Sequence, residues 1–176
     1  LSQVGTATSA AIPAPLNYVS KTDVSGKYMM HLSMNGMSIM KQVLNGATGY
    51  MSQQGQKMDL DAATIAEMKS MSQPVKELEM LTKKDLKLNG IEKIDEQDAY
   101  VVVDGKSSSY YSVATGLKIA DVVKAEGGES SMIYKNYKAV NGVMFPHTVL
   151  VNLGIEIEIT ISETKVNEGV SDADFQ

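Results

Sequence analysis

Few side chains in this sequence have the types and spacing that catalysis or metal binding requires. The chain contains two histidines, His31 and His147, and no cysteine, so a zinc site of two histidines and a carboxylate would need both of them. Neither histidine lies in an HExxH or HxxEH pattern, where helical spacing would place two ligands on one face. We therefore expect no metal site and no cofactor, and we interpret His147 as an ordinary strand histidine.

Short groups of serine, glutamate and glycine residues also fit positions in a β-sheet better than catalytic or phosphate-binding roles. The serines at 107–109 lack the GxSxG or SxxK context of an activated nucleophile and are typical of a polar strand start. Glu156 and Glu158 stand two residues apart, which on a strand places both on one solvated face. Gly127-Gly128 lacks the strand-to-helix setting of a phosphate loop and predicts a hairpin. We expect that this domain is not an enzyme.

The charge and composition exclude two further classes of protein. The net charge is −5 and all 16 basic residues are lysines, so the chain has no guanidinium fork for guanine or phosphate. We therefore expect no nucleic-acid partner. No segment reaches the ~18 consecutive apolar residues of a membrane-spanning helix. The first ten residues, LSQVGTATSA, lack the basic and apolar regions of a secretion signal, which fits either a removed leader or a fragment of a longer chain.

The elements that would have to position any site are predominantly strands. Turn signals such as Asn-Gly, Asp-Gly and Ser-Gly recur at roughly the 8–12-residue spacing of an antiparallel all-β domain. The segments between them are strand-like: 27–34, 37–44, 49–54, 98–104, 107–113, 117–125, 130–140, 144–153 and 155–166. In the last segment four isoleucines alternate with glutamate, threonine and serine, as in a strand with one buried face. We expect residues 1–176 to form one mainly β domain.

The Asn141-Gly142 pair predicts one specific hairpin. Type I′ turns need a positive φ at both central positions, and Asn-Gly adopts this conformation readily. The pair should therefore join a strand that ends at Val140 to one that begins near Val143. Pro146 has no N–H for a central position in a sheet, so the Phe-Pro step indicates a sheet edge or a bulge.

One region departs from the strand pattern and predicts a small helical insert. Residues 59–72 carry apolar side chains near one face at helical spacing: Leu60, Ala63, Ile65, Met68 and Met71. Asp61 is the expected N-cap, and Pro74 should end the helix. We expect residues 75–81 to be helical as well and residues 85–95 to return to a strand. Such an insert would lie across one face of the sheet.

The strand-like segment 27–34 raises the question of what the apolar side chains face. Tyr28, Met30, Leu32 and Met34 fall on one side of it. If this side is covered, the side chains are core packing. If the sheet curls and leaves its concave side open, they line an apolar groove in which soft methionine side chains suit ligands of variable shape, such as acyl chains. The residues alone leave both alternatives open.

Several stretches resemble the LolA-like, outer-membrane lipoprotein-sorting fold family. The most specific are the hairpin YYSVATGLKI at 110–119, the hairpin YKAVNGVMFPH at 137–147 and the ending KVNEGVSDADF at 165–175. The sequence is most similar to the LolA-like domain at the C-terminal end of secreted insulinase-type zinc peptidases of Bacteroidetes. This resemblance covers most of the chain, from about Gly26 onward.

The resemblance implies a strongly curved antiparallel sheet, an unclosed half-barrel, with helices that cover the concave face and a hydrophobic cavity between them. It also implies a periplasmic or cell-envelope location, and it makes the helix near Asp61 a lid element. The ligand-binding residues would be Met30, Leu32, Met34, Ile65 and Met68. The chain has no arginine, so the arginine-linked gating of the lipoprotein carrier does not carry over, and the helix expected ahead of the first strand is missing or lies upstream of Leu1.

Two functions follow from this resemblance. In the first, the domain is a non-catalytic module of the cell envelope whose partner is a lipid, a lipoprotein acyl chain or another apolar ligand. In the second, it is a structural or docking domain of a secreted zinc peptidase, without a ligand of its own. The second function predicts an upstream peptidase domain with an HxxEH motif in the same chain.

Overall fold

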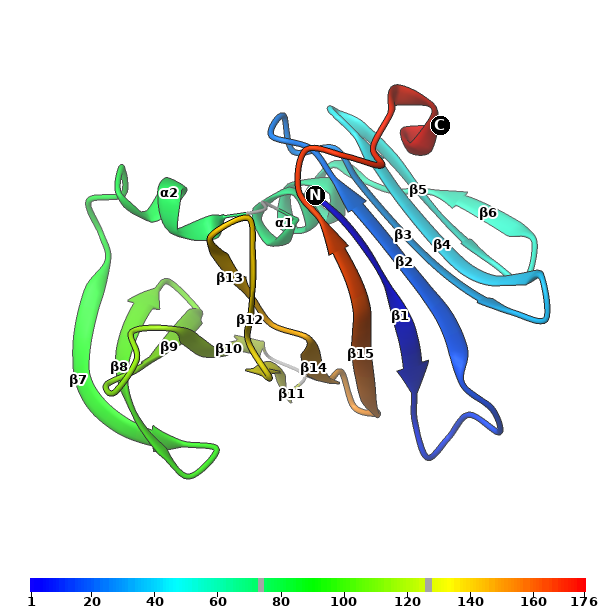
Figure 1. Ribbon diagram of the computed structural model, residues 1–176. Coiled ribbons are helices and arrows are strands. Elements are labelled where there is room, and N and C mark those ends of the chain that lie inside the picture. The colour runs from blue at the N-terminus through cyan, green and yellow to red at the C-terminus, as the bar shows by residue number, and fades with distance from the viewer. Residues whose placement is uncertain (73–74, 126–127) are drawn as a thin grey trace.

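One large antiparallel sheet forms most of the molecule (Figure 1). The computed structural model describes residues 1–72, 75–125 and 128–176. Within these ranges thirteen strands pair in the order β6-β5-β4-β3-β2-β1-β15-β14-β11-β10-β9-β8-β7, and β12 and β13 pair separately. All pairings are antiparallel, and most join strands that are consecutive in the chain; the exceptions are β1 with β15 and β11 with β14.

The elements have the following bounds. The strands are β1 (Ser2–Thr8), β2 (Leu16–Thr22), β3 (Tyr28–Met34), β4 (Met37–Asn45), β5 (Thr48–Gln53), β6 (Gln56–Asp59), β7 (Lys87–Ile94), β8 (Gln97–Asp104), β9 (Ser107–Ser112), β10 (Lys118–Ala125), β11 (Gly128–Lys135), β12 (Lys138–Val140), β13 (Val143–Phe145), β14 (Thr148–Asn152) and β15 (Glu156–Lys165). The helices are α1 (Ala62–Met71), α2 (Lys76–Met80) and the 3-10 helix η1 (Asp172–Phe175).

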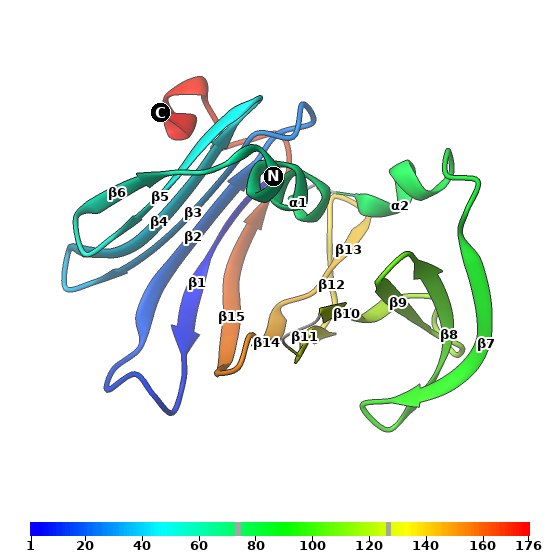
Figure 2. The same ribbon diagram turned by 180° about the vertical axis from the view of Figure 1, so that it is seen from behind.

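The sheet is bent and does not close. Its edge strands, β6 and β7, stand at opposite ends of the strand order. Figures 1 and 2 show a first arm of strands β1 to β6 and a second arm of strands β7 to β10, joined by β11, β14 and β15. The helices α1 and α2 lie on one side of the sheet, which we call the helix face; the opposite side, which η1 contacts, is the outer face. The predicted fold class, an unclosed antiparallel half-barrel with a small helical insert on its concave face, is confirmed.

Two central strands were missing from the sequence prediction. β1 lies between β15 and β2, and β2 pairs with β3, so the first 22 residues complete the middle of the sheet. The segment SQVGTAT of β1 is small and polar, without the apolar alternation that marks a strand. Gly5 belongs there because a Cβ atom at this position would come within 2.1 Å of the Thr160 carbonyl oxygen on β15.

The hairpin at 141–142 is confirmed, but the strands around it are shorter than predicted. Asn141 and Gly142 have positive φ angles of 49° and 82°, and Val140 pairs with Val143. The predicted strand over 130–140 is interrupted after β11, where Asn136 has a φ of 54°. The predicted strand over 144–153 is interrupted between β13 and β14. β12 and β13 therefore form a separate two-stranded sheet.

His147 follows Pro146 in the break between β13 and β14, so its interpretation as a strand histidine is wrong. The residue is buried, with an exposed fraction of 7%. Its backbone N–H donates to the Lys135 carbonyl at 3.1 Å, and its Nδ1 lies 3.1 Å from the Phe145 carbonyl oxygen. These contacts fix the turn by which the chain re-enters the large sheet.

The helical insert begins as the sequence predicts. The Asp61 carboxylate accepts a hydrogen bond from the Thr64 amide at 2.8 Å, which caps α1. α2 falls within the predicted range 75–81, and β7 within 85–95. The strand β6, directly before α1, was not predicted. The expected helix stop at Pro74 and the hairpin turn at Gly127 lie outside the described residues, and of the Met71 side chain nothing is described.

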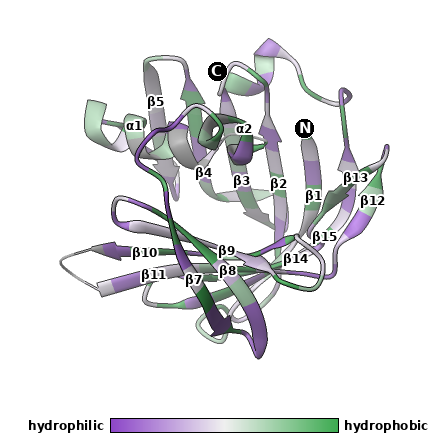
Figure 3. Ribbon diagram, turned by 90° about the vertical axis from the view of Figure 1, so that its left-hand side faces the viewer, coloured by the Kyte–Doolittle hydropathy of each residue, from purple (hydrophilic) through white to green (hydrophobic). Residues whose placement is uncertain are grey.

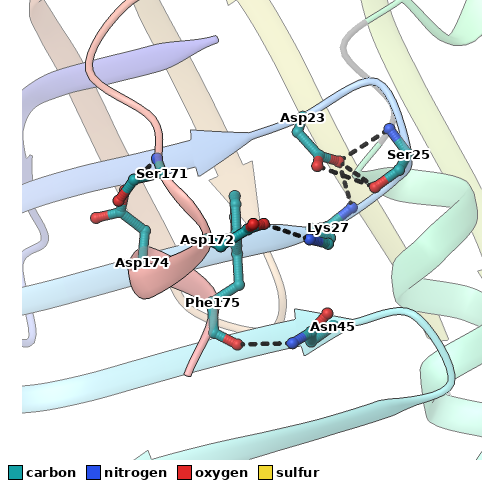
Figure 4. Close-up of polar contacts among 8 residues, drawn as sticks. All are labelled: Asp23, Ser25, Lys27, Asn45, Ser171, Asp172, Asp174 and Phe175. Carbon is teal, nitrogen blue, oxygen red and sulfur yellow. Dashed lines mark hydrogen bonds and ion pairs between the residues drawn. The ribbon is translucent and has the colours of Figure 1, made fainter.

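The C-terminal segment binds the outer face of the first arm. Phe175 of η1 is 2% exposed and packs with Met29 and Val43. Its carbonyl oxygen accepts a hydrogen bond from the Asn45 side chain at 3.2 Å, and Lys27 pairs with Asp172 at 2.6 Å (Figure 4). The first arm is therefore covered on its outer face by residues far away in sequence.

Candidate functional site

Three of the predicted ligand-binding residues lie together on the helix face of the first arm. Leu32 is 8% exposed and belongs to a cluster with Ala7, Leu16 and Tyr18. Met30 and Met34 are half-buried and pack against this cluster. Part of the predicted lining is thus already in contact with the protein's own side chains.

The other two predicted residues, Ile65 and Met68, lie on α1 and are half-buried. α1 packs over β4 and β5. The Leu60 side chain, just before α1, reaches within 3.2 Å of a Cβ built on Gly49 of β5, beside Leu44 of β4. Ile65 and Met68 therefore stand over the edge of the first arm, whereas Leu32 packs toward its centre.

The second arm carries large apolar side chains that remain exposed. Ile91 of β7 pairs with Tyr100 of β8, which pairs with Tyr111 of β9. Cross-strand partners share a face, and Tyr111 contacts α2, so these residues lie on the helix face. Ile91 is 56% exposed, Tyr100 42% and Leu88, which pairs with Val102 on the same face, 69%. Figure 3, which looks at the molecule from the β7 side, shows this arm bending below the two helices.

A polar network connects the second arm to α2. The Asp121 carboxylate accepts hydrogen bonds from the Ser109 hydroxyl at 2.5 Å and the Tyr134 hydroxyl at 2.9 Å. Lys118 Nζ lies 3.2 Å from Asp121 Oδ2 and 3.2 Å from Glu77 Oε1 on α2. The Tyr111 hydroxyl donates to the same Glu77 oxygen at 3.1 Å. The network therefore contains one ammonium group and two carboxylates, of which only Glu77 comes from a helix.

The electrostatics of the network keep its phenols in the neutral form. Burial, and then the negative charge of Asp121, raises the pKa of Tyr134. Burial, and then Glu77, raises the pKa of Tyr111 and brings that of Tyr137 to about 12. A tyrosine activated for proton transfer or attack would need the opposite shift. These phenols therefore stay neutral near pH 7 and serve as hydrogen-bond donors.

Glu77 remains charged within the network. Burial alone would raise its pKa, but the charge of Lys118 and the hydrogen bonds from Lys118 and Tyr111 together hold the pKa below its ordinary value. A charged carboxylate is therefore the natural occupant of the position between Lys118 and Tyr111.

One cavity of the described surface lies away from both arms' helix contacts. A cavity of about 400 Å³ is lined by the loop after β1 and the start of β15: Thr8, Ser9, Ala10, Ala11, Ile155, Glu156 and Glu158. Glu156 and Glu158 are exposed, as predicted for a solvated strand face. The cavity contains none of the predicted ligand-binding residues.

Two further findings concern metals and membranes. In the described part of the chain, His, Asp and Glu side chains form no group of three that could hold a metal ion. Among the helices of these ranges, none has the length and apolar character needed to cross a membrane.

Solved structures share the architecture of this chain. A LolA superfamily protein from Nitrosomonas europaea matches with a TM-score of 0.64 over 99% of this chain and 88% of its own, at 11% identity. A domain assigned as an outer membrane lipoprotein-sorting protein, from Vibrio parahaemolyticus, gives the same TM-score and coverage at 14% identity. This chain has a LolA-like fold. A DUF1329 family protein from Desulfovibrio piger shares it, with a TM-score of 0.63, 13% identity, and coverage of 99% and 89%.

The LolA-like fold confirms the architectural part of the sequence resemblance. At identities of 11–14%, the likeness to these structures is one of fold. No protein-family model matches the chain, and no curated protein does. The similarity to domains of Bacteroidetes zinc peptidases stays a prediction.

The polar network was missed by the sequence prediction, although a signal for it was present. The hairpin YYSVATGLKI contains Tyr111 and Lys118 on opposite sides of the Thr115-Gly116 turn, which makes them cross-strand neighbours. Asp121 follows three residues after Lys118. Glu77 lies more than 30 residues earlier in the chain and joins this pair only in three dimensions, so no local pattern connects them.

Proposed function

We propose that this domain is a non-catalytic binding module that holds a lipid, a lipoprotein acyl chain or another apolar ligand on the helix face of its half-barrel. Met30, Leu32, Met34, Ile65 and Met68 are the proposed lining of the first arm. The observation that carries the proposal is the exposure of Leu88, Ile91 and Tyr100 on the face that the two helices cover only in part.

Exposed apolar side chains on a concave face favour the binding of an apolar ligand, because binding removes their surface from water. Soluble proteins rarely leave contiguous apolar patches larger than a few hundred Å² without a ligand or partner. Removing ~300 Å² of apolar area from water would contribute about 7 kcal/mol before the costs of association. Methionine side chains, such as Met30 and Met34, can adjust their shape to ligands of different chain length.

A titration with a fluorescent fatty-acyl probe tests this function. The wild-type protein should bind the probe, and saturating probe should raise the thermal midpoint, because a ligand that binds only the folded state stabilises it. Met30→Asp should weaken binding, since it places a carboxylate in the proposed lining. The control is Val24→Asp, which introduces the same charge between β2 and β3 at a position that is 94% exposed.

The site residues and the function can be rejected separately. If Met30→Asp and Val24→Asp bind the probe equally well, the lining assigned to the first arm is wrong. If the wild-type protein neither binds the probe nor shows a shift of the thermal midpoint, the binding function is wrong. Leu32→Asp is less informative than Met30→Asp, because Leu32 is buried in the cluster and its replacement by a charge would disturb folding.

The same fold supports a location in the cell envelope as part of the proposal. One of the similar structures is assigned as an outer membrane lipoprotein-sorting protein domain, and the sequence resembles the same fold family. Fractionation of the producing cells, with the domain detected by an antibody, should place it in the periplasm or envelope. Recovery in the cytoplasmic fraction alone would contradict this part.

A second function, that of a structural or docking domain of a secreted zinc peptidase, is favoured by one observation. Leu32 is buried, and Met30 and Met34 pack against the same cluster, so this arm is filled in part by its own side chains, as a scaffold would be. In this case the parent reading frame should encode an HxxEH motif upstream of Leu1. A reading frame that begins just before Leu1 with a signal sequence would reject this function and favour an independent carrier.

A further inference from the structure

We infer that Lys118 and Tyr111 form a binding site for the anionic head group of an amphiphile, and that the Glu77 carboxylate occupies this site in the free protein. This inference rests on the proposed binding function and names the chemical class of its ligand. It also gives α2 a role, because this helix carries Glu77, whose carboxylate takes the place of the ligand head group in the free protein.

The two donors are held by the sheet and converge on one point. Lys118 of β10 and Tyr111 of β9 are cross-strand partners on the helix face. Lys118 Nζ and the Tyr111 hydroxyl lie 3.2 and 3.1 Å from the same atom, Glu77 Oε1. An ammonium and a phenol that meet at one carboxylate oxygen form a charge-assisted site, which any carboxylate or phosphate oxygen could fill.

The sheet fixes the Lys118 side chain independently of α2. Its second partner, Asp121, lies three residues further along the same strand, β10, and accepts hydrogen bonds from Ser109 and Tyr134. The Tyr137 hydroxyl donates to the Lys118 carbonyl at 2.5 Å. An ammonium group has three donors, so Lys118 keeps Asp121 as a partner whether Glu77 or a ligand occupies the other position.

Glu77 differs from Asp121 because it is the one carboxylate of the network carried by a helix. It lies on α2, whose neighbouring apolar residues Val75, Leu78 and Leu81 are 43%, 64% and 82% exposed. Few apolar contacts therefore oppose a displacement of α2 from the sheet. An anionic head group that takes the place of Glu77 would leave the donors satisfied and allow these apolar side chains to contact the ligand.

The surroundings of the pair select an amphiphile over a small anion. From Tyr111 the register leads directly to Tyr100 and Ile91, both exposed on the same face. The Met80 sulfur lies 3.5 Å from the Tyr111 hydroxyl. An acyl chain attached to the head group could lie on these side chains. The net charge of −5 repels anions in general, so a preference for an anionic amphiphile would have to come from this local pair.

Calorimetric titration of the whole chain tests the inference with three amphiphiles that share a twelve-carbon tail. These are dodecanoate, dodecyltrimethylammonium and dodecyl maltoside, each below its micelle-forming concentration. Wild-type protein should prefer dodecanoate. Glu77→Gln removes the competing charge and should tighten dodecanoate binding about tenfold, as expected when a charge-assisted competitor is lost. Binding of the other two amphiphiles should stay unchanged. The control Glu168→Gln removes one exposed carboxylate elsewhere and should have no effect.

A second variant and two small anions complete the test. Tyr111→Phe, introduced into the Glu77→Gln protein, should reverse most of the gain for dodecanoate and leave dodecyl maltoside unaffected. Acetate and inorganic phosphate, which have a head but no tail, should compete only at concentrations far above that of dodecanoate. If they compete as well as dodecanoate does, the pair is a site for free anions and the inference fails.

The remaining outcomes separate this inference from the proposed function. If all three amphiphiles bind equally and Glu77→Gln changes nothing, the head-group site is wrong while the apolar binding function stands. If Glu168→Gln tightens dodecanoate binding as much as Glu77→Gln does, the effect is one of net charge and the site is wrong. If no amphiphile binds to either protein, the binding function itself is rejected.

Discussion

The two arms of the sheet stabilise themselves in different ways. In the first arm, apolar side chains are buried on both faces: Leu32 and its neighbours under the helix face, Met29 and Val43 under η1 on the outer face. In the second arm, the helix face carries exposed Leu88, Ile91 and Tyr100 beside a network of charges and phenols. Both arms bury apolar side chains, Val101 and Val122 in the second among them, but the second also keeps apolar area on its helix face available for binding.

This difference also explains why the C-terminal segment docks where it does. A sheet arm with only one covered face would expose Met29 and Val43 on the other. η1 covers them with Phe175, and ion pairs from Lys21 and Lys27 to Asp174 and Asp172, each 2.6 Å long, hold it in place. The first arm is therefore expected to be sensitive to changes in packing, and the second to changes in its polar network.

The largest effect is expected from removing the ring that covers the outer face of the first arm. Phe175→Ala should destabilise the protein by about 4 kcal/mol, through lost burial and the cavity that remains. The matched change in the second arm, Tyr100→Ala, removes a ring that is 42% exposed and should cost about 1 kcal/mol or less. Urea unfolding followed by circular dichroism measures both. Equal losses would show that the two arms do not differ as described.

The helix faces of the arms can be compared with a pair of leucines. Leu32→Ala should lower the free energy of unfolding by about 3 kcal/mol, because Leu32 is packed between Ala7, Leu16 and Tyr18. Leu88→Ala should change it by less than about 0.5 kcal/mol, because the side chain is 69% exposed. The same urea titration applies. A large loss for Leu88→Ala would mean that the second arm is closed in solution and has no apolar surface to offer a ligand.

In the second arm, the loss of a polar group should lower the free energy of unfolding more than the loss of an exposed apolar side chain does. Asp121→Ala leaves the hydroxyls of Ser109 and Tyr134 and one donor of Lys118 without their acceptor, which should cost about 2 kcal/mol. Asp98→Ala, an exposed residue on β8, is the control and should be close to neutral. If Asp121→Ala is also neutral, water replaces the carboxylate easily and the network does not stabilise this arm.

The strands of both arms are predicted from the same two local patterns, apolar alternation and turn residues. The prediction is most accurate where these patterns are clear. Apolar alternation and Asn-Gly turns locate β3, β4 and β15, and the N-cap Asp61 locates α1, because each depends on residues near one another in the chain. β1 was missed because small polar side chains suffice in the centre of a sheet, where neighbouring strands supply the cover.

The candidate site was less predictable because its members meet only through the fold. Strand alternation placed Met30, Leu32 and Met34 on one face, and the structure agrees. Alternation also places Met29 and Val43 on the other face, but nothing local predicts that Phe175 returns to cover them. Glu77 likewise meets Lys118 only because the fold brings α2 next to β9 and β10.

The smallest predicted effect concerns acid and the C-terminal segment. Burial would raise the pKa of Asp174, but hydrogen bonds from Lys21 and Ser171 and the charge of Lys21 outweigh it, so the pKa is lowered. In the unfolded chain an aspartate titrates near pH ~4. The folded state therefore binds fewer protons, and the stability that Asp174 contributes is complete above that pH and is lost as the pH falls through the lower folded value.

Asp174→Asn should therefore lower the free energy of unfolding by less than about 1 kcal/mol at pH 7, as is usual for partly exposed ion pairs. At a pH below both pKa values it should not change the free energy of unfolding. Asp23, whose pKa is also lowered, offers a second probe in the same arm: burial opposes the shift, whereas hydrogen bonds from Ser25 and Lys27 produce it. Urea unfolding of wild type and variant between pH 2 and 7 measures the difference. A gap that stays constant across this range would show that Asp174 acts through packing and that its charge does not hold η1 on the first arm.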